Sequence, residues 1–294
     1  MANKTLTFAI FGNTFQSRKS LPLSKAVGHL RSRGMAIALD RQFYDFIAAQ
    51  RYLDMTGIGI INGDDFTADY AISMGGDGTF LKSAMRVGAK AIPLIGINMG
   101  RLGFLANVLP EDTEAALDAV IEGRYGIDRH SVIEIATSGG SIGGCRYALN
   151  DIAVLKRDNA SMISIRTHVD GNYLTTYQAD GLIVSTPTGS TAYSLSNGGP
   201  IIVPNTATMC LTPVAPHSLN IRPIVIADSS VVRLEVLSRS HNYLVAVDGR
   251  SYTMHEGSVV TISKAPFSTL VVKPQDSSYF TSLRDKMMWG ADKR

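Results

Sequence analysis

A cluster of glycines between an apolar strand and an amphipathic helix is the feature that most constrains the fold of this chain. Residues Tyr70–Met74 form a short apolar run that predicts a buried strand, and Thr79–Val87 carries apolar side chains at helical spacing. Gly75, Gly76 and Gly78 lie in the turn between them. Glycine permits a sharp turn and a close approach of the backbone to a ligand, because it has no Cβ. The sequence therefore predicts a strand–turn–helix unit.

An aspartate, Asp77, lies in the middle of this turn. The first backbone N–H groups of a helix attract phosphate oxygens, whereas a carboxylate repels them. An aspartate is useful there if it holds a substrate hydroxyl or helps to position Mg²⁺ beside the phosphates. The alternative is a structural role in which Asp77 caps the helix. The turn lacks both the Gly-Lys-Ser/Thr ending of a Walker loop and the Gly-x-Gly-x-x-Gly spacing of the dinucleotide fingerprint.

The first part of the chain alternates between strands and helices. The expected strands are Leu6–Phe11, Tyr70–Met74 and Ala91–Ile97, and the expected helices are Ser24–Arg33, Thr79–Val87 and Glu111–Ile121. Strands that alternate with helices favour a parallel sheet covered by helices. We therefore expect an α/β domain over residues 1–128.

From Arg129 onward the pattern changes to short strands separated by turn residues. The expected strands are Val132–Thr137, Arg146–Leu149, Ile152–Leu155, Ser164–Val169, Tyr173–Gln178, Ile221–Ala227, Val231–Leu237, Tyr243–Val247 and Val259–Ser263. Asp170-Gly171 and Asp248-Gly249 are strong turn signals, and we interpret Asp248 as a turn residue rather than a substrate ligand. We expect a β-rich domain over residues 129–275. A C-terminal segment, 276–294, is expected to pack back on the first domain, with a helix or turn around Ser282–Trp289.

The composition favours a protein of a reducing compartment. The chain has 294 residues, which suits two domains, and a formal net charge of +3 with scattered Lys and Arg. The two cysteines, Cys145 and Cys210, are far apart in the sequence, so we expect no disulfide framework. The apolar run Leu6–Phe11 is too short to span a membrane. We therefore expect a cytoplasmic protein without nucleic-acid or membrane partners.

Several segments, taken in order, resemble the NAD kinase family. The Gly-Gly-Asp-Gly-Thr turn alone is shared with diacylglycerol and sphingosine kinases and, more loosely, with phosphofructokinases. Three further segments resemble the NAD kinase family rather than these other kinases. They are Asn98–Leu105, then Asp180–Ser194 continuing through Gly198-Gly199-Pro200, then Leu211–Pro213 continuing to Arg222-Pro223.

The resemblance implies a Rossmann-like N-terminal domain, a β-rich, β-sandwich-like C-terminal domain and an active site in the cleft between them. It also implies transfer of the γ-phosphoryl group of ATP to the 2′-hydroxyl group of the adenosine ribose of NAD. A divalent metal ion, expected to be Mg²⁺, takes part, and no residue is assigned as its ligand. Homo-oligomers, dimers or tetramers, are usual in the family.

The resemblance also assigns roles to single residues. Asp77 matches the proposed proton acceptor, Gly78 lies beside the dinucleotide, and Gly76 is expected to be a further substrate-binding position. Asn150 and Asp151 match a pair that binds the adenosine region, although the family usually has Asn-Glu there. The remaining substrate-binding positions are Asp180, which matches a binding carboxylate, and Thr191, Ala192, Tyr193 and Ser196, which match residues around the adenine. The ring of Tyr193 could stack on the flat face of the base.

Two further departures from the family and two alternative functions remain. Ser161 lies where some members of the family have histidine, and Gln178 where some have arginine. A lipid kinase that shares the glycine-rich turn is the main alternative, although no amphipathic segment for docking on a membrane is evident. A nucleotide sensor that kept the fold and lost the chemistry is the second.

Overall fold

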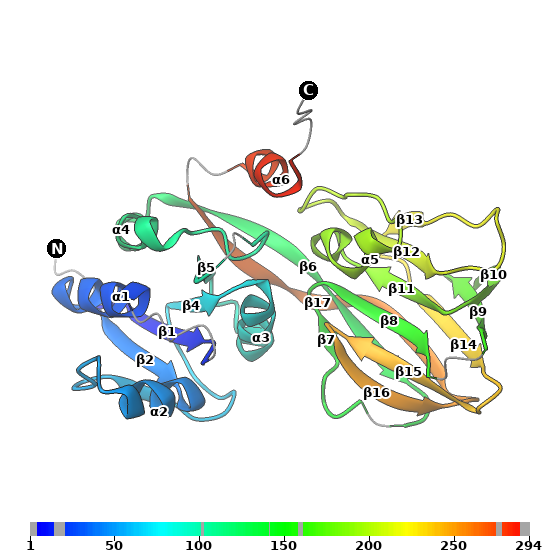
Figure 1. Cartoon of the computed structure of the whole chain (residues 1–294), viewed down its shortest axis with the longest axis horizontal. Coiled ribbons are helices and arrows are strands. Elements are labelled where there is room, and N and C mark those ends of the chain that lie inside the picture. Colours follow the sequence, from blue (N-terminus) through cyan, green and yellow to red (C-terminus); the bar gives the residue numbers. More distant parts are fainter. Residues whose placement is uncertain are drawn as a thin grey trace. The chain divides into compact units, whose positions relative to one another are not determined.

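The computed structural model describes residues 5–14, 21–100, 103–140, 142–157, 161–274 and 278–288. The chain forms two compact units (Figure 1). The first comprises Met1–Arg129 together with Thr269–Arg294, and the second comprises His130–Ser268. The second unit thus ends at Ser268 rather than at 275. The reason is the long strand β17, Val259–Pro274, whose last part pairs with a strand of the first unit.

The first unit is built on a parallel sheet whose strands run in the order β17-β5-β4-β1-β2-β3. Besides β17, the strands are β1 (Thr7–Gly12), β2 (Ala36–Asp40), β3 (Gly59–Ile61), β4 (Tyr70–Gly75) and β5 (Leu94–Asn98). The strands β1, β4 and β5 are apolar along their length and almost wholly buried. Strands buried on both faces are typical of a parallel sheet with helices on each side. The parallel sheet that the alternating pattern predicted is therefore confirmed.

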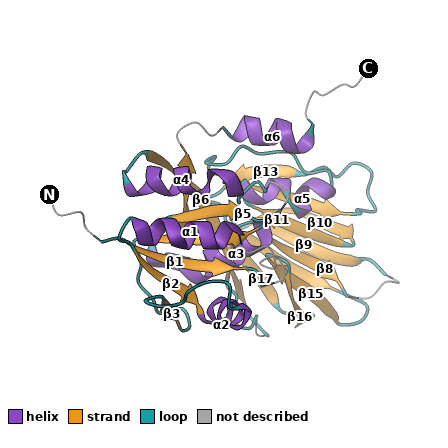
Figure 2. Ribbon diagram, turned by 60° about the vertical axis from the view of Figure 1, so that its left-hand side comes forward, coloured by secondary structure: helices purple, strands orange, loops and turns teal. Residues whose placement is uncertain are grey.

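Helices connect and cover these strands (Figure 2). They are α1 (Leu21–Ser32), α2 (Arg41–Gln50), α3 (Asp77–Val87) and α4 (Thr113–Ile121), with short 3₁₀ turns η1 (Gly88–Lys90) and η2 (Pro110–Asp112). A further helix, α6 (Tyr279–Met287), follows the last strand, and its Tyr279 packs against Phe104. Apolar side chains of α1, α2 and α4 join those of β1, β2 and β4 in one buried cluster. The phenyl ring of Phe80 in α3 is also fully buried. The helices thus bury their apolar stripes against the sheet.

The second unit contains two antiparallel sheets. In the first, β10-β9-β14-β17 lie side by side, and β6 and β7 extend it along β17. Their bounds are β6 (Tyr125–Thr137), β7 (Tyr147–Ala148), β9 (Ile163–Val169), β10 (Asn172–Ala179) and β14 (Val232–Leu237). Buried and exposed side chains alternate along β14, so one face of this sheet lies in the interior.

The second sheet has six strands in the order β13-β12-β11-β8-β15-β16. They are β8 (Asp151–Lys156), β11 (Gly181–Ser185), β12 (Thr208–Val214), β13 (Ile224–Ala227), β15 (Asn242–Val247) and β16 (Arg250–His255). Every residue of the central strand β11 is buried. A short 3₁₀ helix, η3 (Thr188–Thr191), and a single helical turn, α5 (Tyr193–Ser196), follow β11. The β-rich second domain is therefore confirmed.

The two turn signals of this unit fold as predicted. Asp170 and Gly171 join β9 to β10 with φ of 50° and 78°, and Asp248 and Gly249 join β15 to β16 with φ of 44° and 79°. Positive φ at both central residues is the geometry that suits the right-handed twist of a hairpin.

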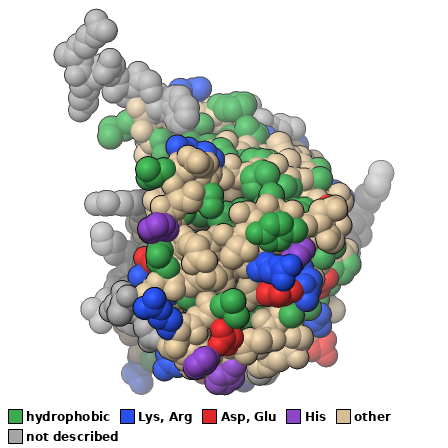
Figure 3. Space-filling view, turned by 90° about the vertical axis from the view of Figure 1, so that its right-hand side faces the viewer, with side chains coloured by type: hydrophobic (Ala, Val, Ile, Leu, Met, Phe, Trp, Pro, Cys, Tyr) green, Lys and Arg blue, Asp and Glu red, His purple; other side chains and the backbone are tan. Residues whose placement is uncertain are grey.

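One face of the molecule can be inspected in Figure 3. Apolar side chains are scattered over it among polar ones, and most of the Lys and Arg side chains stand in separate places. Charges of both signs meet where they do gather. The described residues of this face therefore form no continuous basic stripe of the kind that follows a nucleic-acid backbone.

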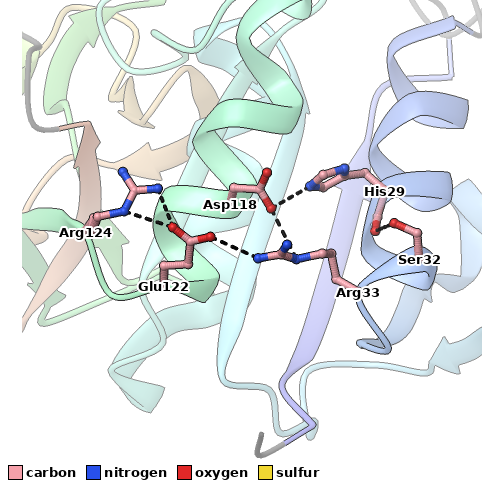
Figure 4. A network of polar contacts seen from close by, with 6 residues as sticks. All are labelled: His29, Ser32, Arg33, Asp118, Glu122 and Arg124. Carbon is pink, nitrogen blue, oxygen red and sulfur yellow. Dashed lines mark hydrogen bonds and ion pairs between the residues drawn. The ribbon is translucent and has the colours of Figure 1, made fainter.

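A polar network joins α1 to α4 at the surface of the first unit (Figure 4). The Nε2 atom of His29 lies 2.9 Å from Oδ1 of Asp118, and Nε of Arg33 lies 3.3 Å from the same oxygen. Arg33 also donates to Glu122 at 3.1 Å, and Arg124 contacts that carboxylate from the other side. Beneath the network, the side chain of Leu117 is fully buried.

We predict that the buried leucine, and not the network, fastens α4. Leu117→Ala should lower the free energy of unfolding by about 2–5 kcal/mol, because it leaves a cavity. Asp118→Asn should lower it by about 1 kcal/mol or less, because these ion pairs are partly exposed to water. Urea denaturation followed by circular dichroism measures both losses. A greater loss in Asp118→Asn than in Leu117→Ala would contradict this ranking.

Candidate functional site

The glycine-rich turn lies where the strand order of the first unit reverses. The strands β1, β2 and β3 extend the sheet in one direction, and β4 and β5 extend it in the other. Ligands of open α/β sheets bind outside the carboxyl ends of the strands at such a switch point. β4 ends at Gly75, and α3 begins two residues later at Asp77. The topology therefore places Gly75–Asp77 at the position in the sheet that is most suited to a ligand.

The carboxylate of Asp77 does not cap its own helix. Gly76 is the N-cap residue and no side-chain capping bond is present. Instead, Asp77 accepts hydrogen bonds from three consecutive backbone N–H groups, those of Phe104 at 2.8 Å, Leu105 at 3.0 Å and Ala106 at 3.1 Å. The structural alternative of a helix cap is therefore wrong. The carboxylate fixes the segment that follows β5 against the start of α3.

Four glycines around this carboxylate differ in the space available to a side chain. A Cβ on Gly103 would lie 1.9 Å from Oδ1 of Asp77, and one on Gly75 would lie 2.2 Å from Oγ1 of Thr79. A Cβ on Gly76 or Gly78 would meet nothing within 4 Å apart from the backbone of α3 itself. Gly75 and Gly103 are thus required by packing. Gly76 and Gly78 face open space, where a ligand can approach the backbone.

A lysine near Asp77 was missed by the sequence analysis. The Nζ atom of Lys286, in α6, lies 3.9 Å from Oδ2 of Asp77. Its position could have been noticed from its spacing, because Tyr279, Leu283 and Lys286 are separated by four and three residues and so share one face of the helix. Arg101, in the segment that resembles the family after β5, lies outside the described residues.

In the second unit, Asp248 holds the Asn150–Asp151 pair. Its carboxylate accepts hydrogen bonds from the backbone N–H groups of Leu149, Asn150 and Asp151 at 2.8, 2.9 and 3.0 Å. The backbone N–H of Asp248 in turn donates to the carbonyl oxygen of Asp151 at 3.0 Å. Asp248 is a turn residue, as expected, but its side chain has a second function that the turn signal did not reveal.

The side chain of Asp151 lies in an environment that favours its protonated form. Only 6% of the residue is exposed. Burial, and then the nearby charge of Asp248, raise the pKa of Asp151 to about 7. Burial raises the pKa of Asp248 as well, and its three backbone hydrogen bonds lower it in part. Near neutral pH, Asp151 can therefore either donate or accept a hydrogen bond from a ligand.

The turn after β11 packs against the same pair. Thr186 donates from its backbone N–H to the carbonyl oxygen of Asn150 at 2.9 Å, and from its hydroxyl group to that of Leu149 at 2.5 Å. A Cβ on Gly189 would lie 2.0 Å from the carbonyl oxygen of Asn150. The structure thus brings Asn150 and Asp151 together with the turn that leads into η3 and α5.

The sequence-predicted adenine residues lie on η3 and α5. Thr191 ends η3, where its hydroxyl group donates to the carbonyl oxygen of Thr188 at 3.3 Å. Ala192 lies between the two elements, and Tyr193 begins α5 with 40% of its surface exposed. Ser196 ends α5 and is also exposed. An exposed tyrosine next to small polar residues is a suitable surface for a flat base.

Asp180 is not part of this group. Strand pairing sets Ser185 opposite Asp151, and Gly181 opposite Leu155, so Asp180 lies at the other end of β8 and β11. There its carboxylate forms an ion pair with Lys156 at 2.8 Å. Gln178 and Ser161, where some members of the family have arginine and histidine, line a cavity of about 570 Å³ whose other walls include Arg239 and Glu256.

The described residues contain no group of three His, Cys, Asp or Glu side chains that could hold a metal ion by themselves. Within the described part of the chain, no helix has both the length and the apolar character needed to cross a membrane.

Comparison with known proteins identifies relatives for both units. The ATP-NAD kinase N-terminal domain matches residues 44–125, and the ATP-NAD kinase C-terminal domain matches residues 149–274. An NAD kinase of Bacteroides fragilis is 52% identical over 98% of this chain and 100% of that protein. An NAD kinase of Porphyromonas gingivalis is 40% identical over 96% of this chain and 98% of that protein.

Two solved structures share the fold. An NAD kinase from Archaeoglobus fulgidus in complex with ATP has a TM-score of 0.71 at 25% identity, and covers 96% of this chain and 98% of that one. Yeast NADH kinase in complex with NADH has a TM-score of 0.89 at 22% identity, and covers 100% of this chain and 90% of that one. The likeness to the yeast protein concerns the fold alone.

We predict that the four glycines fall into two classes. Gly76→Ala and Gly78→Ala should fold normally and bind ATP about tenfold or more weakly, because the added methyl group occupies the space left for a ligand. Gly75→Ala and Gly103→Ala should lower the melting temperature, because Thr79 or Asp77 must move. Thermal unfolding and isothermal titration calorimetry with ATP separate the two effects. Full ATP affinity in Gly76→Ala and Gly78→Ala would contradict a ligand site at this turn.

We further predict a pH dependence of stability that arises from Asp151. The folded protein keeps the proton of Asp151 to a higher pH than the unfolded chain, so this group makes stability fall as the pH rises from its ordinary pKa of 3.8 to about 7. Above that range its contribution is constant. Asp151→Asn should make this loss of stability with rising pH smaller. The variant should therefore gain stability relative to the unaltered protein between pH 4 and pH 8.

The measurement is the melting temperature as a function of pH, with Asp180→Asn as the control. Asp180 is partly exposed and paired with Lys156, so its replacement should leave the fall between pH 4 and pH 7 in place. A profile of Asp151→Asn that parallels that of the unaltered protein would show that the Asp151 carboxyl group has no raised pKa.

Proposed function

This chain belongs to the NAD kinase family, and we propose that it transfers the γ-phosphoryl group of ATP to the 2′-hydroxyl group of the adenosine ribose of NAD. The observation that carries the proposal is the fixed carboxylate of Asp77 in a glycine-rich turn at the switch point of the sheet. The relatives at 52% and 40% identity, matched over nearly their whole length, support the same reaction. The lipid kinase alternative has no support among the comparisons.

The reaction forms one bond and breaks one. The 2′-oxygen of NAD attacks the γ-phosphorus of ATP, and the bond from that phosphorus to the bridging oxygen breaks. The electron pair of the broken bond leaves with ADP, and the proton of the 2′-hydroxyl group passes to the carboxylate of Asp77. Phosphoryl transfer has a loose transition state, so catalysis depends mainly on positioning and on neutralising charge. The three backbone bonds to Asp77 support this role, because they hold the carboxylate in one orientation.

The start of α3 provides the surface for the phosphates. The first N–H groups of a helix have no partner within the helix, and its dipole favours negative charge there. Gly76 and Gly78 leave this part of the backbone open to a ligand. When bound to ATP, Mg²⁺ would supply further neutralisation of the phosphate charge, held mainly by the phosphates, as is common for this ion.

For the adenosine part of NAD we propose the group formed by Asn150, Asp151 and the residues of η3 and α5. Asp151 is one methylene shorter than the glutamate usual in the family, and Asp248 fixes the backbone that carries it. The exposed ring of Tyr193 would stack on the adenine, with Thr191, Ala192 and Ser196 beside it. A substrate-binding role for Asp180 remains a prediction, as do the cytoplasmic location and the homo-oligomeric state.

Two finer features of the fold fit this function. The strand order β3-β2-β1-β4-β5 is that of a dinucleotide-binding sheet, which supports a Rossmann-like first unit. Contacts of β9 and β10 with β11 and of β10 with β12 join the two sheets of the second unit, which supports a sandwich-like arrangement.

We predict that Asp77→Asn lowers kcat for NADP formation by about 10²–10⁴-fold, because the amide cannot accept the proton. The assay contains ATP, Mg²⁺ and NAD, and follows NADP with an NADP-specific dehydrogenase. Asp112→Asn, at an exposed helix start, is the control and should retain full activity.

A second measurement separates chemistry from folding, because Asp77 also anchors residues 104–106. If Asp77 is the proton acceptor, kcat should fall far more than the affinity for NAD, even where the loss of one acceptor oxygen lowers the melting temperature. A loss of kcat that merely follows a loss of NAD binding and stability would assign Asp77 an anchoring role only. An unaltered protein that forms no NADP would refute the proposed reaction and would also leave the sensor alternative standing.

A further inference from the structure

The helix α6 points one lysine inward at the Asp77 site. Its inward face carries Tyr279, Leu283 and Lys286. The ring of Tyr279 packs against that of Phe104 at 6.3 Å between centroids, and Leu283 is buried. Lys286 is the third member of this stripe, and only 12% of its side chain is exposed. Its spacing from Tyr279 and Leu283 places Lys286 on the inward face of the helix, where apolar residues normally lie.

The ammonium group of Lys286 has close neighbours, but its N–H donors are not all used in hydrogen bonds. Its Nζ atom lies 3.9 Å from Oδ2 of Asp77 and 3.9 Å from the centre of the Phe104 ring. The first distance is too long for a hydrogen bond, and the second is a cation–π contact. Among the described residues, no oxygen accepts a hydrogen bond from this group. An ammonium group has three N–H donors, so Lys286 keeps donors available for an anion.

The position is also unfavourable for a lysine that only packs. Burial lowers the pKa of Lys286, and the charge of Asp77 offsets this only in part. A methionine would fill the same volume without the loss of hydration. The neighbouring Arg284 and Asp285 of α6 are exposed, so the helix does not lack outward positions for charged residues.

The glycine-rich turn lacks a cation of its own. A Walker loop ends in a lysine that reaches the phosphates, and this turn continues with Gly78 and Thr79 instead. Phosphoryl transfer requires positive charge near the moving group. We propose that Lys286 supplies this charge by donating hydrogen bonds to the γ-phosphate of ATP next to Asp77. The proposal rests on the NAD kinase function and adds a substrate-binding residue to it.

In the reaction, Lys286 neither gains nor loses a proton. It would neutralise charge on the non-bridging oxygens of the phosphoryl group while the 2′-oxygen binds the phosphorus and ADP departs. Its ammonium group also limits the repulsion between the carboxylate of Asp77 and the phosphates, because it lies beside that carboxylate.

The test compares Lys286→Met with Arg284→Met, a matched loss of a cation from the exposed side of the same helix. Lys286→Met should lower kcat/KM for ATP by about 10–100-fold, the usual range for one hydrogen bond to a charged group. KM for NAD should stay within about threefold of the unaltered value, and the melting temperature should be unchanged or higher. Inorganic tripolyphosphate should inhibit the variant less strongly in competition with ATP. Arg284→Met should leave all these quantities unchanged.

Two outcomes would overturn the inference. The first is a kcat/KM for ATP in Lys286→Met that equals that of Arg284→Met. The second is an equal loss of kcat/KM for ATP and for NAD together with a lower melting temperature. This result would show that Lys286 only holds α6 in place. Both presuppose that the unaltered protein forms NADP. An unaltered protein that forms no NADP would refute the proposed function itself, and this result can be told apart from both outcomes above.

Discussion

The arrangement of the first unit depends on a carboxylate that receives three consecutive backbone amides. By binding Phe104–Ala106, Asp77 ties the segment after β5 to the start of α3, at the point where the strand order reverses. Gly103 must be glycine because that carboxylate occupies the space of a side chain. One aspartate therefore shapes the wall of the candidate site and also presents the group that we propose as the proton acceptor. Positioning of this kind is the main requirement of phosphoryl transfer.

The second unit uses the same device. Asp248 binds the amides of Leu149, Asn150 and Asp151, and so orders the backbone that carries the two residues assigned to adenosine. The difference lies in solvation. Asp151 is buried and lies near the charge of Asp248, whereas Asp77 is partly exposed and has a lysine beside it. A buried carboxyl group such as that of Asp151 suits neutral contacts with a nucleoside, and a partly exposed carboxylate beside a cation suits phosphates.

The sequence predicted local features well and distant contacts poorly. The turn at Gly75–Asp77 and the hairpin at Asp170-Gly171 follow from residues that are adjacent in the chain, and both appear as expected. The strand β11 was missed, because its fully buried sequence lacks alternation. The bonds from Asp77 to residues 104–106 and from Asp248 to residues 149–151 leave no periodic signal, because they join segments that lie far apart in the chain. The spacing of Lys286 from Tyr279 and Leu283 did mark it as lying on one helix face, but its contact with Asp77, far away in the chain, left no such signal.

The strand β17 makes the folding of the first unit depend on the synthesis of the second. Its first part belongs to the second unit, and from Thr269 onward it belongs to the first, where Val271 pairs with Leu94. During synthesis on the ribosome, residues 1–129 emerge first but lack this strand and α6 until the whole second unit has been made. The N-terminal unit cannot therefore finish folding before its successor has emerged. Domains usually fold in the order of translation, and in this chain the interrupted connectivity postpones completion of the first.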